Sequence, residues 1–501
     1  MSSSGSSRDG PPDQLPDPVK VRGKAETVHP RVAIRSNVKW LAAANFGVKP
    51  VWFLFLLAST RILGAGQFGS YMFALSLVSV IAIFMEGGID IHLVRELSPE
   101  GERFPDLFSH TLLLKVTSAV LVMAVAAGAS LFISLPPGML LLLLLAGGFS
   151  GSNAVMLHCR AAFRSFEVMK YEAFSIMVEK GVVMVFCMAA LLVVNSAVSF
   201  MAGYALAYGI ACGFTLFLVF TRIGRPRFAF SARYLWEKVI RPALPFALMN
   251  IFTVIYFRSG TLLISLLTGS DQLVGYYNAG YRLVESYMLF PAIIAGPIYP
   301  VLVRRIAVAE DAGDILLQAV RAVLPLSVVF AVPLFLFRAD FTRVLFGDGY
   351  APAHDAVGIV ALSMIPVGMN FIFGTVVAAS GRQRTGNKFI ALVTALNIIM
   401  NLVLIPMYGV AGAATATVLT ESMLAVSYFW IVRDQVRLGA TASLLWRIAA
   451  PVMLAAFVFM LGPAGGIFFL KLGVFLAVVG TAFLMLGVIS ISDLKKLVRA
   501  Q

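Results

Sequence analysis

Charged residues are scarce in this chain. Asp, Glu, Lys and Arg make up 13% of its 501 residues, whereas hydrophobic residues make up 59%. A soluble domain carries about 25% charged residues, so this composition, with a mean hydropathy of +0.89, excludes an ordinary soluble fold. The sequence predicts a polytopic membrane protein. For such a protein, the number of domains cannot be estimated from chain length as it is for soluble proteins.

Cysteine and the common catalytic motifs are also missing or rare. The cysteines Cys159, Cys187 and Cys212 lie in or beside apolar runs, and their odd number and spacing fit neither a disulfide framework nor a metal site. We interpret them as small buried hydrophobic residues. The chain has no HExxH motif, no GxSxG motif and no Cys/His cluster. We therefore expect no enzymatic activity, no metal and no cofactor.

Apolar runs dominate what is present. A spanning helix needs about 20 mostly apolar residues, and fourteen such runs can be found. They lie near residues 40–62, 67–89, 109–134, 138–158, 173–194, 197–221, 242–267, 276–301, 316–337, 355–379, 387–406, 409–431, 447–462 and 466–489. Residues 1–36 are instead rich in Ser, Pro and charge, which predicts a disordered tail without a secretory signal.

The basic residues predict the topology. Lys and Arg number 39 against 25 Asp and Glu, and most lie in the two tails and the even-numbered connections. Because basic residues favour the cytoplasmic side, we expect both termini to be cytoplasmic in the inner membrane. This distribution explains the net charge of +14 without a nucleic-acid partner. A secondary interpretation is attraction of the basic N-terminal tail to anionic lipids.

Two distant segments of the chain resemble each other. Residues 61–84 and 266–290 each place a Gly-containing turn before a long apolar run, and a one-residue gap after the first glycine aligns Gly69 with Gly275. In the predicted topology both copies begin on the outer side, so the halves are parallel repeats, the plan of a transporter with a site between two lobes. The alignment also places Ser76 opposite Arg282, which makes the two copies chemically unequal.

The predicted fold class is an all-α polytopic membrane protein of about 14 transmembrane helices. Two parallel six-helix repeats form two lobes around a central cavity, and two C-terminal helices follow. The predicted divisions are a disordered tail (1–36), an N-lobe (37–222), a cytoplasmic linker (223–241), a C-lobe (242–432), and the last two helices with a basic tail (433–501).

Several short motifs follow one another between residues 36 and 435. They include Phe68-Gly69-Ser70-Tyr71, Leu93-Val94-Arg95-Glu96, Val274-Gly275-Tyr276-Tyr277, Tyr281-Arg282-Leu283, Ala379-Ser380-Gly381-Arg382, Leu404-Ile405-Pro406 and Gly412-Ala413-Ala414. Their order resembles the polysaccharide-biosynthesis flippases of the multidrug/oligosaccharidyl-lipid/polysaccharide exporter superfamily. The resemblance implies transfer of a polyprenyl-diphosphate-linked oligosaccharide to the outer leaflet without ATP hydrolysis. Many relatives carry an Asp shortly after the Arg of helix 7, where this chain has Ser259 and Gly260.

Charged residues inside the runs are the candidate substrate-binding residues, because charge in a span usually faces a cavity or a partner. Lys49 lies in the middle of the first run beside Pro50, which loosens the helix backbone. Arg258 lies in the outer half of the seventh run, with Asn250 two turns earlier on the same face. Arg can bind a diphosphate through two parallel hydrogen bonds. A purely structural ion pair is the alternative for Lys49.

Two further charged pairs lie in the runs. Arg282 and Glu285 are three residues apart, so they either neutralise each other or contact substrate in the cavity. Glu179 and Lys180 are adjacent and either extend to the interface or pair between helices.

Glu421 stands near the middle of the twelfth run with no basic residue one turn away. A buried carboxylate of this kind is a candidate for ion coupling; pairing with a basic residue of the other lobe is the alternative. We interpret the asparagines of the C-lobe as polar contacts between helices: Asn370, Asn397 and Asn401.

We expect a flippase that carries a lipid-linked oligosaccharide for surface polysaccharide by alternating access. Its partners would be the lipid-linked glycan and membrane lipids, with a glycan polymerase and glycosyltransferases nearby. A peptidoglycan lipid-precursor flippase stays open, as does a cation-coupled multidrug exporter, which would favour acidic cavity residues. A membrane scaffold for glycan-assembly enzymes would need no charge inside the spans.

Overall fold

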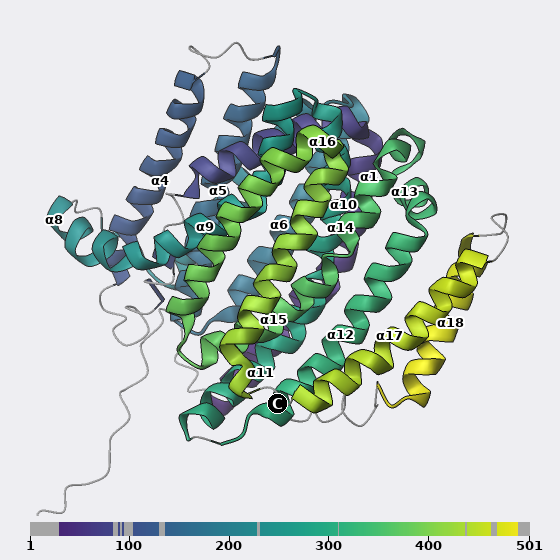
Figure 1. Ribbon diagram of the computed structural model, residues 1–501. Coiled ribbons are helices and arrows are strands. Elements are labelled where there is room, and N and C mark those ends of the chain that lie inside the picture. Colours follow the sequence, from purple (N-terminus) through teal and green to yellow (C-terminus); the bar gives the residue numbers. More distant parts are fainter. Residues whose placement is uncertain are drawn as a thin grey trace, which may run out of the picture.

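The chain is a bundle of long helices lying side by side (Figure 1). The computed structural model describes residues 30–83, 89–90, 93–94, 104–129, 136–227, 231–308, 310–435, 438–461 and 468–488. Within these residues the regular structure is helical, without a strand. The all-α class predicted from the sequence is therefore confirmed.

The N-lobe contains five long helices in the described residues. They are α1 (Pro30–Ile81), α4 (Phe104–Ala129), α5 (Met139–Ser165), α6 (Met169–Val193) and α7 (Ala197–Arg222). The first two predicted runs are joined in α1, which is interrupted at Gly64 with φ 72° and ψ 165°. Glycine adopts this positive φ without the penalty that a Cβ brings, so the chain turns there with almost no loop.

A linker of α8 (Ala232–Tyr234) and η2 (Leu235–Ile240) leads to the C-lobe. The C-lobe helices are α9 (Arg241–Thr268), α10 (Asp271–Tyr287), α11 (Leu289–Ala307), α12 (Gly313–Leu336), α13 (Arg338–Phe346), η3 (Asp348–Ala353), α14 (His354–Ala361), α15 (Met364–Ala379) and α16 (Gln383–Val432). α16 joins two predicted runs and is interrupted at Gly409, where φ is 56°.

Two predicted runs are broken in the structure. The run at 276–301 divides into α10 and α11 at Met288, and the run at 355–379 divides into α14 and α15. A proline follows each break, Pro291 and Pro366. Because proline has no backbone N–H, one helix hydrogen bond is missing at each place.

Eleven helices in the described residues are long and apolar enough to cross a membrane. This number is lower than the fourteen predicted runs because α1 and α16 each contain two of them. The remaining difference is at α17 (Leu438–Leu461), whose described apolar stretch covers only Ser443–Phe457. After α16 come η4 (Arg433–Gln435), α17 and α18 (Phe468–Met485), and the last two stand at one edge of the bundle (Figure 1).

The two lobes meet through the repeated segments. A Cβ on Gly69 would lie 1.7 Å from the carbonyl oxygen of Asp271, and one on Gly275 would lie 1.9 Å from that of Ala65. In the alignment of the repeats, Gly69 corresponds to Gly275 and Ala65 to Asp271. The contact is therefore reciprocal, as expected for two elements related by an approximate two-fold axis.

Polar contacts close the lobes at the same end. Ser70 Oγ donates to a carboxylate oxygen of Asp271. The hydroxyl of Tyr350 donates to the carbonyl of Thr60 at 3.0 Å, and Arg61 donates to that of Val344 at 3.4 Å. The end of the bundle that carries α13 and η3 is thus held shut.

Candidate functional site

A cavity of about 980 Å³ lies between the lobes. One wall comes from α1 and the others from the α10–α11 junction, α12 and α18. Most of the lining is apolar or aromatic, for example Trp52, Phe53, Phe290 and Phe330. Arg282 and Glu285 are the charged side chains among the described lining residues.

Arg282 and Glu285 form the local ion pair that their spacing predicted. Arg282 Nη1 lies 3.0 Å from Glu285 Oε2, and Arg282 Nη2 approaches the sulfur of Met72 in the N-lobe at 3.2 Å. The Nε of Arg282 is buried without a hydrogen-bond partner in the described residues. The pair therefore neutralises its own charge in the cavity wall and leaves one donor unused.

Arg258 is half-buried in α9, within electrostatic reach of the phenols of Tyr71 in α1 and Tyr281 in α10. It makes neither an ion pair nor a hydrogen bond in the part of the chain that the structure describes. Asn250 is half-buried two turns earlier in the same helix and has interactions of its own. The described lining of the cavity includes neither residue. Lys49 belongs to α1, but its side chain lies outside the described residues.

A second cavity, of about 630 Å³, lies within the C-lobe and shares Met288, Ala292 and Phe371 with the first. Glu421 lines it and is 4% exposed. Its Oε2 accepts a hydrogen bond of 2.7 Å from Asn370 Nδ2, while Asn370 Oδ1 is buried without a partner in the described residues. Glu421 makes no ion pair there, so the alternative of a basic partner in the other lobe finds no support.

Neutral hydrogen bonds join α9 and α10 to α16. Ser259 Oγ donates to Asn397 Oδ1 at 2.7 Å, and Asn397 Nδ2 donates to Thr420 Oγ1 at 3.0 Å. Asn401 donates to Asn397 Oδ1 at 3.0 Å. Tyr277 and Thr417 share a bond of 2.9 Å. Asn397 and Asn370 thus contact neighbouring helices, as predicted for polar residues between spans.

The N-lobe contains two buried charge networks, and the sequence did not predict the one around Asp90. Asp90 contacts both Lys115 Nζ at 3.1 Å and His158 Nδ1 at 2.8 Å, and both basic side chains are fully buried. His158 also contacts Thr111 Oγ1 at 2.8 Å. Asp90 therefore joins two buried basic side chains from different helices.

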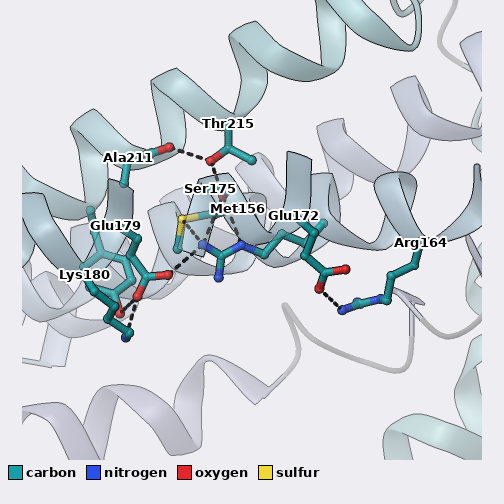
Figure 2. A network of polar contacts seen from close by, with 10 residues as sticks. Met156, Arg164, Glu172, Ser175, Glu179, Lys180, Ala211 and Thr215 are labelled. Carbon is teal, nitrogen blue, oxygen red and sulfur yellow. Dashed lines mark hydrogen bonds and ion pairs between the residues drawn. The ribbon is translucent and has the colours of Figure 1, made fainter. Parts of the chain in front are cut away.

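A second network joins α5, α6 and α7 (Figure 2). Glu179 Oε2 accepts from Arg160 Nη2 at 2.7 Å, and Glu179 Oε1 contacts Lys180 Nζ at 2.6 Å. The adjacent residues Glu179 and Lys180 pair with each other, and Glu179 also pairs between helices. Arg160 was missed because the apolar run ends at residue 158, whereas α5 continues to Ser165.

The acidic residues of the segment between α12 and α15 lie in short helices. Arg338 Nε lies 2.7 Å from Asp355, and Arg343 Nε lies 2.5 Å from Asp348. Each of these exposed acids already has a basic partner. No group of three or more His, Cys, Asp or Glu residues with metal-binding geometry is found among the described residues.

Comparisons with known proteins agree on family and fold. A family model described as "Polysaccharide biosynthesis protein" matches residues 34–306. A probable low-salt glycan biosynthesis flippase of Haloferax volcanii is 26% identical over 151 residues, 29% of this chain and 32% of that protein. An uncharacterised membrane protein of Methanocaldococcus jannaschii is 22% identical over 169 residues, 32% of each. The matches span about a third of the length of these curated relatives.

Solved structures resemble the chain over a greater length. A lipid II flippase, MurJ, in an inward closed conformation has a TM-score of 0.68 at 14% identity, covering 89% of this chain and 97% of that one. An inward-facing multidrug resistance transporter of the MATE family has a TM-score of 0.63 at 12% identity, covering 79% and 98%. At such low identity these likenesses establish the fold alone, a two-lobed bundle of helices.

Proposed function

Since the chain belongs to the polysaccharide biosynthesis protein family, we propose that it moves a polyprenyl-diphosphate-linked oligosaccharide across the cytoplasmic membrane for surface polysaccharide synthesis. The observation that carries this proposal is the cavity between the lobes. It is large, mostly apolar and closed at the end that carries α13. Such a cavity suits an amphiphilic substrate whose lipid tail stays in apolar surroundings.

The diphosphate needs a cation that is not already neutralised. Arg258 meets this need because it has no acidic partner in the described residues, whereas Arg282 is paired with Glu285. A guanidinium can hold a diphosphate through two parallel hydrogen bonds. We assign Arg258 to the diphosphate, with Lys49 as a second cation and Asn250 as a neutral neighbour of Arg258. Arg282 and Glu285 line the path and open their pair when the substrate passes.

Glu421 is the proposed coupling group. A proton on its carboxyl group would let it donate to Asn370 Oδ1, the buried oxygen that otherwise lacks a donor in the described residues. The protonated and ionised forms of Glu421 therefore make different hydrogen bonds with Asn370. A proton gradient across the membrane could change the protonation of Glu421 and so shift the protein between two conformations.

The test is surface-glycan export in cells that carry Arg258→Ala or Lys49→Ala. Losing a charge-assisted hydrogen bond costs about 1.5–3 kcal/mol, so each variant should export roughly 10- to 100-fold less glycan while its amount in the membrane is unchanged. Arg343→Ala removes an arginine that is 75% exposed and should export normally. Unchanged export in both test variants would exclude the assignment, and death of cells lacking the protein would instead favour a peptidoglycan-precursor substrate.

A further inference from the structure

The network around Glu179 carries more positive than negative charge. Arg160 and Lys180 both contact Glu179, and beside them Arg164 pairs with Glu172 at 2.8 Å (Figure 2). These five side chains contain three cations and two anions. Arg160 and Lys180 thus share a single carboxylate in a largely buried site, an arrangement that is costly in a low-dielectric region.

Of the side chains that contact Glu179, Lys180 is the most exposed. The side chain of Glu179 is 3% exposed and that of Arg160 is 7% exposed, whereas that of Lys180 is 23% exposed. Arg160 is also held in place by hydrogen bonds from Nε and Nη2 to Ser175 Oγ. The lysine is therefore the mobile member of the network and the arginine its fixed support.

Lys180 is not among the described residues that line the cavity, but it contacts one of them. Its ammonium group lies over the ring of Trp52 in α1, 4.2 Å from the ring centroid. Trp52 itself lines the cavity between the lobes. A cation over an aromatic ring is stabilised only modestly at a partly exposed site, so an anion in the cavity would compete with the ring successfully.

Glu179 remains well paired if Lys180 moves away. Its Oε2 keeps the bond from Arg160, and its Oε1 keeps a hydrogen bond of 2.8 Å from the hydroxyl of Tyr208. Releasing the lysine therefore leaves no unpaired buried carboxylate, which would otherwise cost several kcal/mol. Lys180 can therefore move away while Glu179 keeps its position and its other two partners.

We propose that Lys180 is an additional anion-binding residue beside the N-lobe wall of the cavity, and that it leaves Trp52 to contact the diphosphate of the lipid-linked substrate. This inference rests on the proposed function. It adds a cation from α6 to Arg258 of the C-lobe and Lys49 of α1.

The test uses the purified full-length protein and farnesyl diphosphate as the probe, with binding followed by tryptophan fluorescence and by calorimetry. Loss of a charge-assisted contact should weaken binding of the probe about tenfold in Lys180→Gln, while Lys180→Arg should retain most of the affinity. The fluorescence change should shrink in Trp52→Phe, because that ring loses its cation when the probe binds. Vesicles of phosphatidylglycerol serve as a second probe, and an equal Lys180 effect there would assign the site to lipid headgroups and overturn the proposal.

Lys170→Gln is the matched control. Lys170 lies on the same helix, is exposed, and also sits over an aromatic ring, Tyr171, at 5.1 Å. This variant should bind the probe like the unmodified protein. Unchanged affinity in Lys180→Gln, or no binding of the probe by the unmodified protein, overturns the inference. If Lys180→Gln binds normally while Arg258→Ala loses export, the inference fails and the proposed function stands; the reverse pattern rejects the role of Arg258 and keeps that of Lys180.

Discussion

The two lobes share a helical plan but differ in how they make buried polar groups tolerable. The N-lobe pairs full charges: Asp90 with Lys115, and Glu179 with Arg160 and Lys180. The C-lobe links its helices mainly through neutral amides and hydroxyls around Asn397. Its most buried acid, Glu421, contacts a neutral amide. The two lobes therefore share a helical arrangement but use different polar groups inside it.

The difference suggests a division of labour between the lobes. A buried ion pair resists separation because breaking it leaves an uncompensated charge. In the N-lobe this favours one arrangement for Asp90 with Lys115 and for Glu179 with Arg160, whereas Lys180 can move because Glu179 keeps two other partners. A lone carboxyl group next to an amide can change its protonation with a smaller rearrangement, so the C-lobe is suited to responding to an ion.

The largest expected effect concerns what the lobes have in common, the reciprocal glycine contact. In Gly69→Ala or Gly275→Ala, the new methyl group overlaps a backbone carbonyl of the other lobe, so the two helices must move apart. Overpacking costs about 1–3 kcal/mol, which should shift the ratio of closed to open molecules roughly 5- to 150-fold and reduce export correspondingly. Cysteines placed at Ser70 and Asp271, which share a hydrogen bond, should cross-link less in both variants.

Gly66→Ala is the control for this contact, because a Cβ at Gly66 meets nothing within 4 Å. Approximate symmetry further requires that the two test variants lose export to a similar degree. A severe defect in one and normal export in the other would show that the contact is not functionally reciprocal.

The next effect concerns Glu179. Glu179→Gln leaves the buried Arg160 without its negative partner, and breaking a buried ion pair costs about 3–5 kcal/mol. The unfolding temperature in detergent should fall markedly. The buried cysteines Cys159, Cys187 and Cys212 provide the measurement, because a thiol-reactive dye reaches them only as the N-lobe unfolds. Glu237→Gln, in an exposed pair with Arg233, should cost less than about 1 kcal/mol; an equal loss in both variants would contradict the network's importance.

Sequence patterns predicted the fold more successfully than they predicted the contacts between side chains. Run length and apolar content located the spans, and the alignment of Gly69 with Gly275 identified two residues that meet in space. Arg282 with Glu285 was predictable because the pair is local, three residues apart along one helix. Each of these signals is contained in a short stretch of chain.

The N-lobe networks could not be predicted in the same way. Asp90, Lys115 and His158 come from three separate parts of the chain, so only packing brings them together. Arg160 follows the end of an apolar run, where a basic residue is expected to lie in a connection between spans. In the structure it is only 6% exposed. Its hydrogen bonds to Ser175 and its pair with Glu179 stabilise a helix extension that hydropathy alone would end earlier.

The smallest expected effect on stability is that of Glu421→Gln, which makes the same Glu-to-Gln change in the C-lobe. In Glu421→Gln the amide oxygen can still accept from Asn370 Nδ2, and the new N–H group can donate to Asn370 Oδ1, which now lacks a partner in the described residues. No cation is left uncompensated, so the unfolding free energy should change by less than about 1 kcal/mol. Export should nevertheless fall, because glutamine mimics only the protonated acid and cannot cycle. A loss of stability as large as that of Glu179→Gln would mean that Glu421 neutralises a cation, and a stable variant with normal export would remove Glu421 from the coupling step.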